Sequence, residues 1–150
     1  MPGQMGGAAF RWSMPVRFGD TDPYGVVFFV SYFRFMKEAL DEFLRACGLP
    51  PERTYRDAEA GRGLPVTASS ARFLAPARYG DILDIEVTAA TFSEKAVTFR
   101  FRIGRIPEGE EVATGEITCV AIDAGWRPIA IPQEWRERML GVNRAPGDPR

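Results

Sequence analysis

The 150-residue sequence contains no histidine and only two cysteines, and neither sign of charge dominates. Without histidine there is no imidazole to act as general base or metal ligand, so acid–base chemistry must come from other groups. A net charge of −1 gives no electrostatic reason to expect nucleic acid or an anionic membrane as a partner. No apolar run approaches the roughly 20 residues of a membrane-spanning helix.

The two cysteines, Cys47 and Cys119, are 72 positions apart, a spacing unlike any common metal motif. Buried, reduced thiols are expected of such a pair, and they favour a cytoplasmic protein. The first residues lack the charged segment and apolar core of a signal peptide. The length fits a single domain over residues 1–150, with an ordered core of about 10–140 and fraying at the proline-rich C-terminal end.

Hydrophobic periodicity indicates the secondary structure. Apolar residues alternate over residues 10–18, which predicts a strand, and Pro15 indicates that it is an edge strand or lies near a bulge. From about Ser31, the expected N-cap, the period becomes that of a helix, which should run for about five turns and end before Gly48. Alternation then predicts four more strands and a last short helix, at residues 64–73, 82–90, 96–104, 112–123 and 132–140.

The order of these elements favours one architecture. Short turns between the later strands suit an antiparallel sheet. A single long helix with a broad apolar stripe needs a sheet to cover it. We therefore expect an α+β protein in which a curved, five-stranded antiparallel sheet wraps around one long central helix.

Two carboxylates, Asp20 and Asp22, stand one residue apart in the stretch FGDTDPYGVVFF (residues 18–29), ahead of the predicted helix. They could cap loop N–H groups, bind a metal ion, or provide a catalytic carboxylate. The metal interpretation is the weakest, because the apolar run that follows supplies no further oxygen ligands. In the catalytic interpretation, free N–H groups at the helix start would hold an oxyanion beside the carboxylate, in a pocket lined by the apolar run.

The segment VRFGDTDPYGVVFFVSYFRFMKEALDEFLRACGLP, continued by LPVTASSARFLAPARYGDILDIEV, resembles hotdog-fold acyl-CoA thioesterases of the 4-hydroxybenzoyl-CoA thioesterase family. The likeness covers roughly residues 10–140, and its most specific part is the D-T-D-x-x-G-V-V string followed by a helix and then by APARYGD. It implies a hotdog fold, hydrolysis of an acyl-CoA thioester to free acid and coenzyme A, no cofactor and no metal, and a homodimer or homotetramer.

The resemblance also implies roles for individual residues. Asp22 matches the catalytic carboxylate, which either attacks the thioester carbonyl or activates water, and Asp20 matches a structural loop acid. The backbone N–H of Phe29 matches the group that polarises the carbonyl. The residues implied to shape the loop, the acyl pocket or a neighbouring subunit's site are Tyr24, Gly25, Val26, Val27, Phe28, Leu64 and Pro65.

Three positions bear on the substrate. Tol-Pal-type members of the family usually carry histidine where this chain has Phe29, whereas the aroyl-CoA branch has an aromatic residue, so an aromatic acyl group is expected. Lys37 stands where the 4-hydroxybenzoyl enzyme uses an acid to accept a hydrogen bond from the substrate's hydroxyl group, which a cation cannot do. Lys37 is therefore either a partner for an anionic acyl group or a solvated helix residue.

The nucleotide end of coenzyme A carries phosphates, which favour basic and hydroxyl side chains. In the resembling family it lies along the rim of the sheet, near the turn that reads FSEKAV here. Ser93 and Lys95 are the candidates in that turn, and an exposed lysine without a ligand is an equally good interpretation of Lys95.

Other functions remain open beside an aromatic acyl-CoA thioesterase. The chain could be a non-catalytic module that binds acyl-CoA or acyl-carrier protein, although such a module gains nothing from the charge of Asp22. It could also hydrolyse short aliphatic acyl-CoA thioesters, or be a purely structural oligomer whose apolar run is buried in an interface. A hotdog dehydratase is excluded, because those enzymes use a histidine together with an acid.

Overall fold

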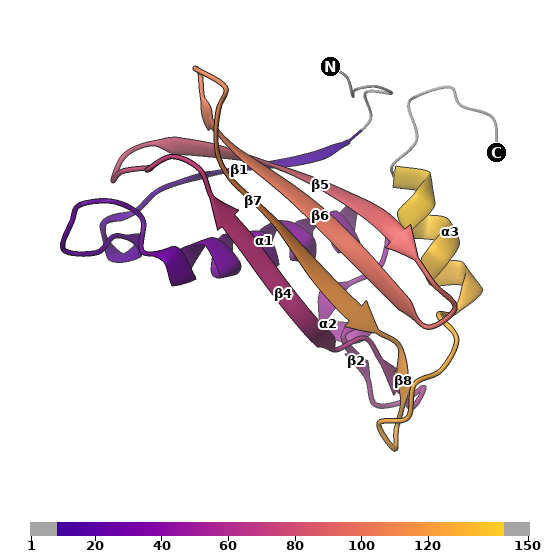
Figure 1. Ribbon diagram of the computed structural model, residues 1–150. Coiled ribbons are helices and arrows are strands. Elements are labelled where there is room, and N and C mark those ends of the chain that lie inside the picture. Colours follow the sequence, from indigo (N-terminus) through magenta and orange to yellow (C-terminus); the bar gives the residue numbers. More distant parts are fainter. Residues whose placement is uncertain (1–8, 143–150) are drawn as a thin grey trace.

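The computed structural model describes residues 9–142 of the chain (Figure 1). The C-terminal fraying expected from the sequence lies outside these residues. The elements, in chain order, are β1 (Phe10–Pro15), the 3₁₀ turn η1 (Phe18–Asp20), α1 (Phe29–Ala46), α2 (Pro51–Thr54), β2 (Arg56–Asp57), β3 (Arg62–Gly63), β4 (Val66–Phe73), β5 (Ile82–Phe92), β6 (Ala96–Ile106), β7 (Glu110–Val120), β8 (Ile122–Asp123) and α3 (Gln133–Val142).

The main sheet has five strands in the order β1-β5-β6-β7-β4, and every neighbouring pair is antiparallel. Figure 1 shows this sheet curving across α1, which lies along one of its faces. The predicted arrangement of a five-stranded sheet around one long helix is thereby confirmed. Pro15 lies on an edge strand, as expected, because an edge strand has a side on which no N–H is needed.

The core lies between this sheet and α1. On β5, Leu83, Ile85 and Val87 are fully buried, while Asp84 and Glu86 between them are half-buried. Burial of each large apolar side chain contributes about 1.5–3 kcal/mol to folding. The fully buried residues of α1 are Phe35, Met36, Ala39, Leu40, Phe43 and Leu44. The buried positions on β5 match the alternation of apolar residues in its sequence, and those on α1 match its apolar helical stripe.

Helix α1 lies close against the sheet at Gly115 on β7. A Cβ atom at this position would lie 2.3 Å from Sδ of Met36 and 2.8 Å from the backbone oxygen of Ser70. Only glycine therefore fits between the helix and strand β4 at this point.

Several boundaries differ from the sequence-based prediction, and three of the differences have a local cause. The helix begins at Phe29, and Ser31 is not its N-cap: the Ser31 hydroxyl donates to the Asp20 carbonyl from inside the first turn. Strand β1 ends at Pro15, because the chain then tightens into η1. The expected strand 112–123 breaks at Ala121, whose N–H and carbonyl pair with Lys95 and Ile129 outside the sheet ladder.

A second, smaller sheet of β2, β3 and β8 was not predicted. Its strands have two residues each, too few for a periodic signal. It lies beyond one end of the main sheet, near α2 (Figure 1). Helix α3, predicted at 132–140, is present at Gln133–Val142.

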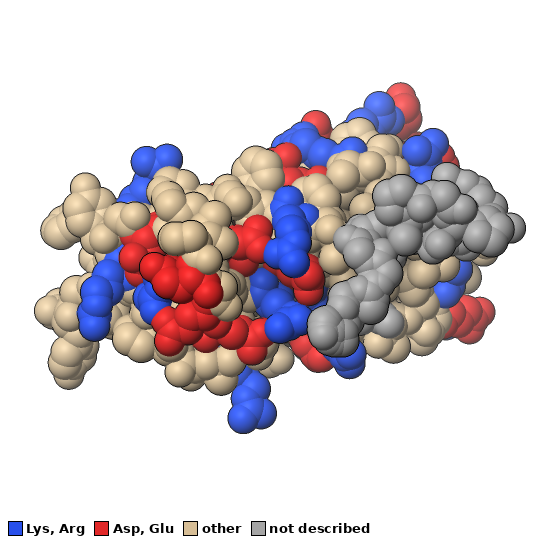
Figure 2. All heavy atoms as spheres, turned by 90° about the horizontal axis from the view of Figure 1, so that it is seen from above, with Lys and Arg blue, Asp and Glu red and all other residues tan. Residues whose placement is uncertain are grey.

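Acidic and basic side chains are interspersed on the face seen from above in Figure 2. Among the described residues, Arg11 is ion-paired with Asp84 and Glu86, and Arg105 with Glu110. No helix within residues 9–142 is long and apolar enough to cross a membrane.

Candidate active site

A short hairpin carries Asp22, and Asp20 directly precedes it as the last residue of η1. Thr21 and Val27 form its isolated bridge, and the Asp22 N–H donates to the Val26 carbonyl at 2.9 Å. The Gly25 N–H closes the turn by donating to the Asp22 carbonyl at 2.8 Å. The returning side is fixed to the segment APARYGD, since the Val27 N–H donates to the Ala77 carbonyl at 2.8 Å. The motif therefore holds a fixed loop directly before α1.

Asp20 is the buried acid of the pair, with 7% of its surface exposed. Its Oδ2 accepts the Arg17 N–H at 2.8 Å, and its Oδ1 is ion-paired with Arg34 of α1. Its carbonyl accepts the N–H of Phe28 at 2.8 Å and the hydroxyl of Ser31 at 3.0 Å. The Arg17 bond fixes Asp20 within the η1 turn, and the other contacts join the loop to the start of the helix, as expected of a structural loop acid.

Asp22 is half-buried, and only one of its carboxylate oxygens is engaged. Oδ1 accepts the Tyr24 N–H at 2.9 Å, an Asx turn that fixes the carboxyl group. Oδ2 has no hydrogen-bond donor within residues 9–142. One oxygen is thus held in place and the other is available to a water molecule or a substrate carbon.

The first turn of α1 offers hydrogen-bond donors beside this loop. Phe28 is the N-cap residue and supplies no side-chain cap, so the N–H groups of Phe29 and Val30 have no acceptor in the described part of the chain. Free N–H groups and the helix dipole place about half a positive charge at this end. Such a position stabilises a negatively charged oxygen.

Aromatic rings surround the helix start. Phe28 and Phe29 are 42% and 54% exposed, with ring centroids 5.1 Å apart. The Phe29 ring contacts Phe73 of β4 at 6.2 Å, and Phe73 contacts the buried Tyr32 at 5.4 Å. Burial raises the pKa of Tyr32 to about 12, so this phenol stays neutral at physiological pH. The surface beside the free N–H groups is therefore apolar and uncharged.

The other residues predicted for the loop and pocket fall into two groups. Tyr24 is 88% exposed at the hairpin tip, and Val26 is half-buried. Val27 is in the core instead, where it anchors the hairpin. Leu64 is also fully buried in the core of its own chain, and Pro65 is half-buried, its carbonyl accepting the Val120 N–H.

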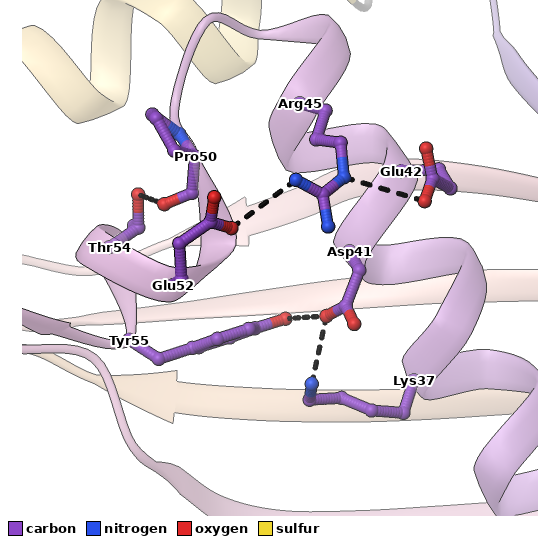
Figure 3. Close-up of polar contacts among 8 residues, drawn as sticks. All are labelled: Lys37, Asp41, Glu42, Arg45, Pro50, Glu52, Thr54 and Tyr55. Carbon is purple, nitrogen blue, oxygen red and sulfur yellow. Dashed lines mark hydrogen bonds and ion pairs between the residues drawn. The ribbon is translucent and has the colours of Figure 1, made fainter.

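Lys37 is committed to a polar cluster on α1, shown in Figure 3. Its Nζ lies 2.8 Å from Oδ1 of Asp41 and 4.2 Å from the centre of the Tyr55 ring. The Tyr55 hydroxyl donates to the same Asp41 oxygen at 2.9 Å, and burial raises the pKa of Tyr55 well above its usual range. Lys37 is thus ion-paired rather than simply solvated, with donor capacity left for an anion.

Ser93 and Lys95 lie in the exposed β5–β6 turn, at the opposite end of the sheet from Asp22 (Figure 1). Ser93 Oγ accepts the Ala96 N–H at 3.0 Å. Strand β5 has 11 residues, and at about 3.4 Å per residue its ends are about 35 Å apart. The residues predicted for catalysis and for the nucleotide are therefore not brought together within one chain.

Sequence reasoning missed Arg34 and Phe73. Arg34 pairs with an acid 14 positions away, and a helical arginine gives no signal of such a partner. Phe73 could have been found, because it continues the inward alternation of Ala71 toward the helix start. Within residues 9–142 no three acidic, cysteine or histidine side chains gather into a possible metal site.

Gly25 gives a test of the loop's conformation. Its φ is +80°, in the left-handed region, and a Cβ atom added there would have no other atom within 4 Å. Gly25→Ala should therefore cost about 1–2 kcal/mol through backbone strain alone. Urea unfolding checks this, with Gly19→Ala as the matched control, because Gly19 has the same open surroundings without the positive φ. An equal loss of unfolding free energy in both variants would contradict the left-handed backbone conformation assigned to Gly25.

A curved five-stranded antiparallel sheet around one long helix is the arrangement of the hotdog fold. The sequence pattern of the thioesterase-like superfamily matches residues 16–139. The chain belongs to this superfamily.

Individual relatives agree with this assignment. The 4-hydroxybenzoyl-CoA thioesterase of Pseudomonas sp. (strain CBS-3) is 31% identical over 128 residues, covering 81% of this chain and 91% of its own. A 4-hydroxybenzoyl-CoA thioesterase solved with 4-hydroxybenzoyl-CoA has a TM-score of 0.79 at 27% identity, covering 88% of this chain and 99% of its own. A 1,4-dihydroxy-2-naphthoyl-CoA thioesterase from Synechocystis shares the fold, with a TM-score of 0.83 at 23% identity, covering 91% and 98%.

Proposed function

We propose that this protein hydrolyses an aromatic acyl-CoA thioester to the free acid and coenzyme A, with Asp22 as nucleophile or general base. The observation that carries the proposal is that Asp22 keeps one carboxylate oxygen free in the loop that leads directly into α1, where the N–H groups of Phe29 and Val30 are also free among the described residues. Its loop is anchored at both sides, so the acid is held in place before substrate binds.

The chemistry follows from these groups. As nucleophile, Asp22 Oδ2 forms a bond to the thioester carbon, the thiolate of coenzyme A leaves, and water then hydrolyses the mixed anhydride. As general base, Asp22 takes a proton from the water that attacks the same carbon. In both routes the carbonyl oxygen becomes negative, and the Phe29 N–H is positioned to stabilise it.

An aromatic acyl group fits the surface around the helix start. The rings of Phe28, Phe29 and Phe73 are half-exposed there, and aromatic rings pack favourably edge to face. Relatives named for hydroxybenzoyl and dihydroxynaphthoyl thioesters support the same class of substrate. A short aliphatic acyl group is the second candidate, supported by a relative named as an acyl-CoA thioester hydrolase from Escherichia coli.

We further propose that the working unit contains at least two copies, paired through β4. This edge strand is exposed on all of its residues except the half-buried Ala71, and it has neither proline nor an inward-pointing charge to protect its free backbone groups. A two-fold axis through β4 would run the two strands antiparallel. The end of one copy that holds Asp22 would then lie near the partner's opposite end, which holds Lys95.

Subunit mixing tests this arrangement. Chains with Asp22→Asn and chains with Lys95→Glu should each be poor enzymes on a CoA thioester, for different reasons. Mixed dimers should contain one intact site each, so co-refolding equal amounts should recover about a quarter of wild-type activity per chain. Recovery no greater than the average of the two parents would contradict a shared site.

The substrate class is tested by thiol release from benzoyl, hydroxybenzoyl, phenylacetyl and aliphatic CoA thioesters. Fastest turnover of an aryl thioester is the expected result. Preference for short aliphatic acyl groups would change the proposed substrate class and leave the proposed hydrolysis mechanism unchanged. Binding of all thioesters without release would establish the non-catalytic module instead.

The protein's own thiols should not disturb such an assay. Cys47 and Cys119 are buried and unpaired, as predicted, and burial raises the pKa of each to about 12. At neutral pH both stay protonated and unreactive. A chromogenic disulfide reagent should therefore label neither thiol in the folded protein and both in urea; rapid labelling of the native protein would contradict this. Two unpaired thiols also fit the cytoplasmic location that we propose.

A further inference from the structure

The described residues form a half-open cavity of about 490 Å³ on the small sheet, and Asp22 and its hairpin contribute nothing to its lining. It lies between β2, β3, β8 and the turn that follows β8. Its lining includes Tyr55, Arg56, Arg62, Ile122 and Trp126. The adjoining strand end is bonded to the β5–β6 turn, because the Ala121 N–H donates to the Lys95 carbonyl at 2.9 Å.

Trp126 is held in an unusual conformation at the rim of this cavity. It is 71% exposed, and its φ of +65° is the left-handed conformation that glycine normally supplies. Asp123 enforces the turn: its Oδ1 accepts the N–H groups of Gly125 and Arg127, and its carbonyl accepts that of Trp126. A large aromatic side chain that is exposed to solvent and held by a strained backbone conformation indicates a binding surface rather than a packing role.

The charged groups that line the cavity are not equally available. Asp123 is occupied by backbone N–H groups, and Asp57 accepts the Ala60 N–H at 3.1 Å. The Arg56 guanidinium has no partner within the described residues. Arg62 is stacked over Trp135, with its Cζ 5.0 Å from the ring, and its Nε is buried without an acceptor among those residues. The cavity therefore offers unpaired arginine donors while its acids are in use.

We propose that this cavity binds a nucleotide, with the base against Trp126 and phosphate oxygens at Arg56 and Arg62. A planar base stacks on an indole ring, and guanidinium groups bind phosphate with paired hydrogen bonds. Ala121, next to the lining residue Ile122, is bonded to Lys95 of the β5–β6 turn, so the cavity would hold the nucleotide end of a thioester whose carbonyl lies at the partner's Asp22. This source of the nucleotide rests on the proposed function; the other source is a free nucleotide that regulates the protein.

The first measurement is the affinity of the wild-type protein for adenosine 3′,5′-bisphosphate, the nucleotide portion of coenzyme A, and for ATP, by calorimetry. Trp126→Gly removes the ring and should fold well, because glycine accepts the positive φ. Arg56→Ala removes one cation. Each change should weaken nucleotide binding at least tenfold. Arg127→Ala, in the same turn but outside the cavity lining, is the matched control and should bind as the wild type does.

Kinetics separate the two sources. If the nucleotide belongs to the substrate, both variants lower kcat/KM for benzoyl-CoA, through KM, about tenfold relative to kcat/KM for benzoyl N-acetylcysteamine thioester, which has no nucleotide. If only free-nucleotide affinity falls and this ratio is unchanged, the site is regulatory. Absence of nucleotide binding to the wild type, or wild-type affinity in both variants, overturns the proposal. Absence of thiol release with nucleotide binding intact would instead overturn the proposed enzymatic activity.

Discussion

Asp22→Asn should lower kcat by roughly 10²–10⁴-fold, the usual contribution of a positioned catalytic carboxylate. The amide cannot attack the thioester or take a proton from water, yet it is almost the same size. Its oxygen can still accept the Tyr24 N–H, so the loop should keep its shape. Steady-state thiol release on an aryl-CoA, with urea unfolding as the fold check, measures the effect. Wild-type turnover in this variant would remove Asp22 from the mechanism.

Asp20→Asn is the matched control, because the same change is made two positions away. Asp20 is buried and paired with Arg34, so losing its charge should lower the free energy of unfolding by about 1–2 kcal/mol. The folded fraction should retain most of its turnover. A folded Asp20→Asn protein without activity would show that the roles of the two acids are reversed.

Phe29→Pro should lower kcat by roughly 10²–10³-fold, as expected for removal of one oxyanion donor. Proline has no backbone N–H, and the Phe29 N–H has no partner within residues 9–142 that the change could break. The first helical position tolerates proline well. Phe28 already has the extended conformation, φ −64° and ψ 133°, that a residue before proline prefers. The helix should therefore form normally.

The ring and the N–H must be separated, because Phe29→Pro removes both. Phe29→Ala keeps the N–H and removes only the ring that contacts Phe28 and Phe73. This control should mainly raise KM for aryl thioesters and leave most of kcat. If alanine lowers kcat as much as proline does, the ring and not the N–H carries the effect, and the oxyanion assignment fails.

Elements with a long periodic signal could be predicted from the sequence. Strand β5 alternates apolar and polar residues along its length, and α1 repeats apolar residues every three or four positions. Both patterns arise because one face of each element is buried in a single core. The predicted N-cap of α1 is Ser31, three residues later than the actual N-cap Phe28, because Ser31 is a good N-cap by type. The actual start is set by bonds from Phe28 and Ser31 back to Asp20, which a linear pattern does not contain.

The residues of the candidate site also fall into those that the sequence indicates and those that only the structure brings together. The motif around Asp20 and Asp22 could be identified because its turn residues, acids and helix start follow one another along the chain. Arg34 and Phe73 could not be assigned, because they reach the motif from other elements. Lys37 is ion-paired with Asp41, one helical turn away on the same helix. Tyr55, which donates a hydrogen bond to the same Asp41 oxygen, comes from beyond the helix.

The sequence by itself determined the fold class, the order of the main elements and the loop that carries Asp22, because these depend on local periodicity and on turn residues. Only the tertiary structure decided which acid is buried, which backbone N–H groups stay free, and that Asp22 and Lys95 lie at opposite ends of one sheet. It also formed the cavity beside Trp126 from separate strands and turns. These features depend on contacts between distant segments, which form only when the sheet closes around the helix.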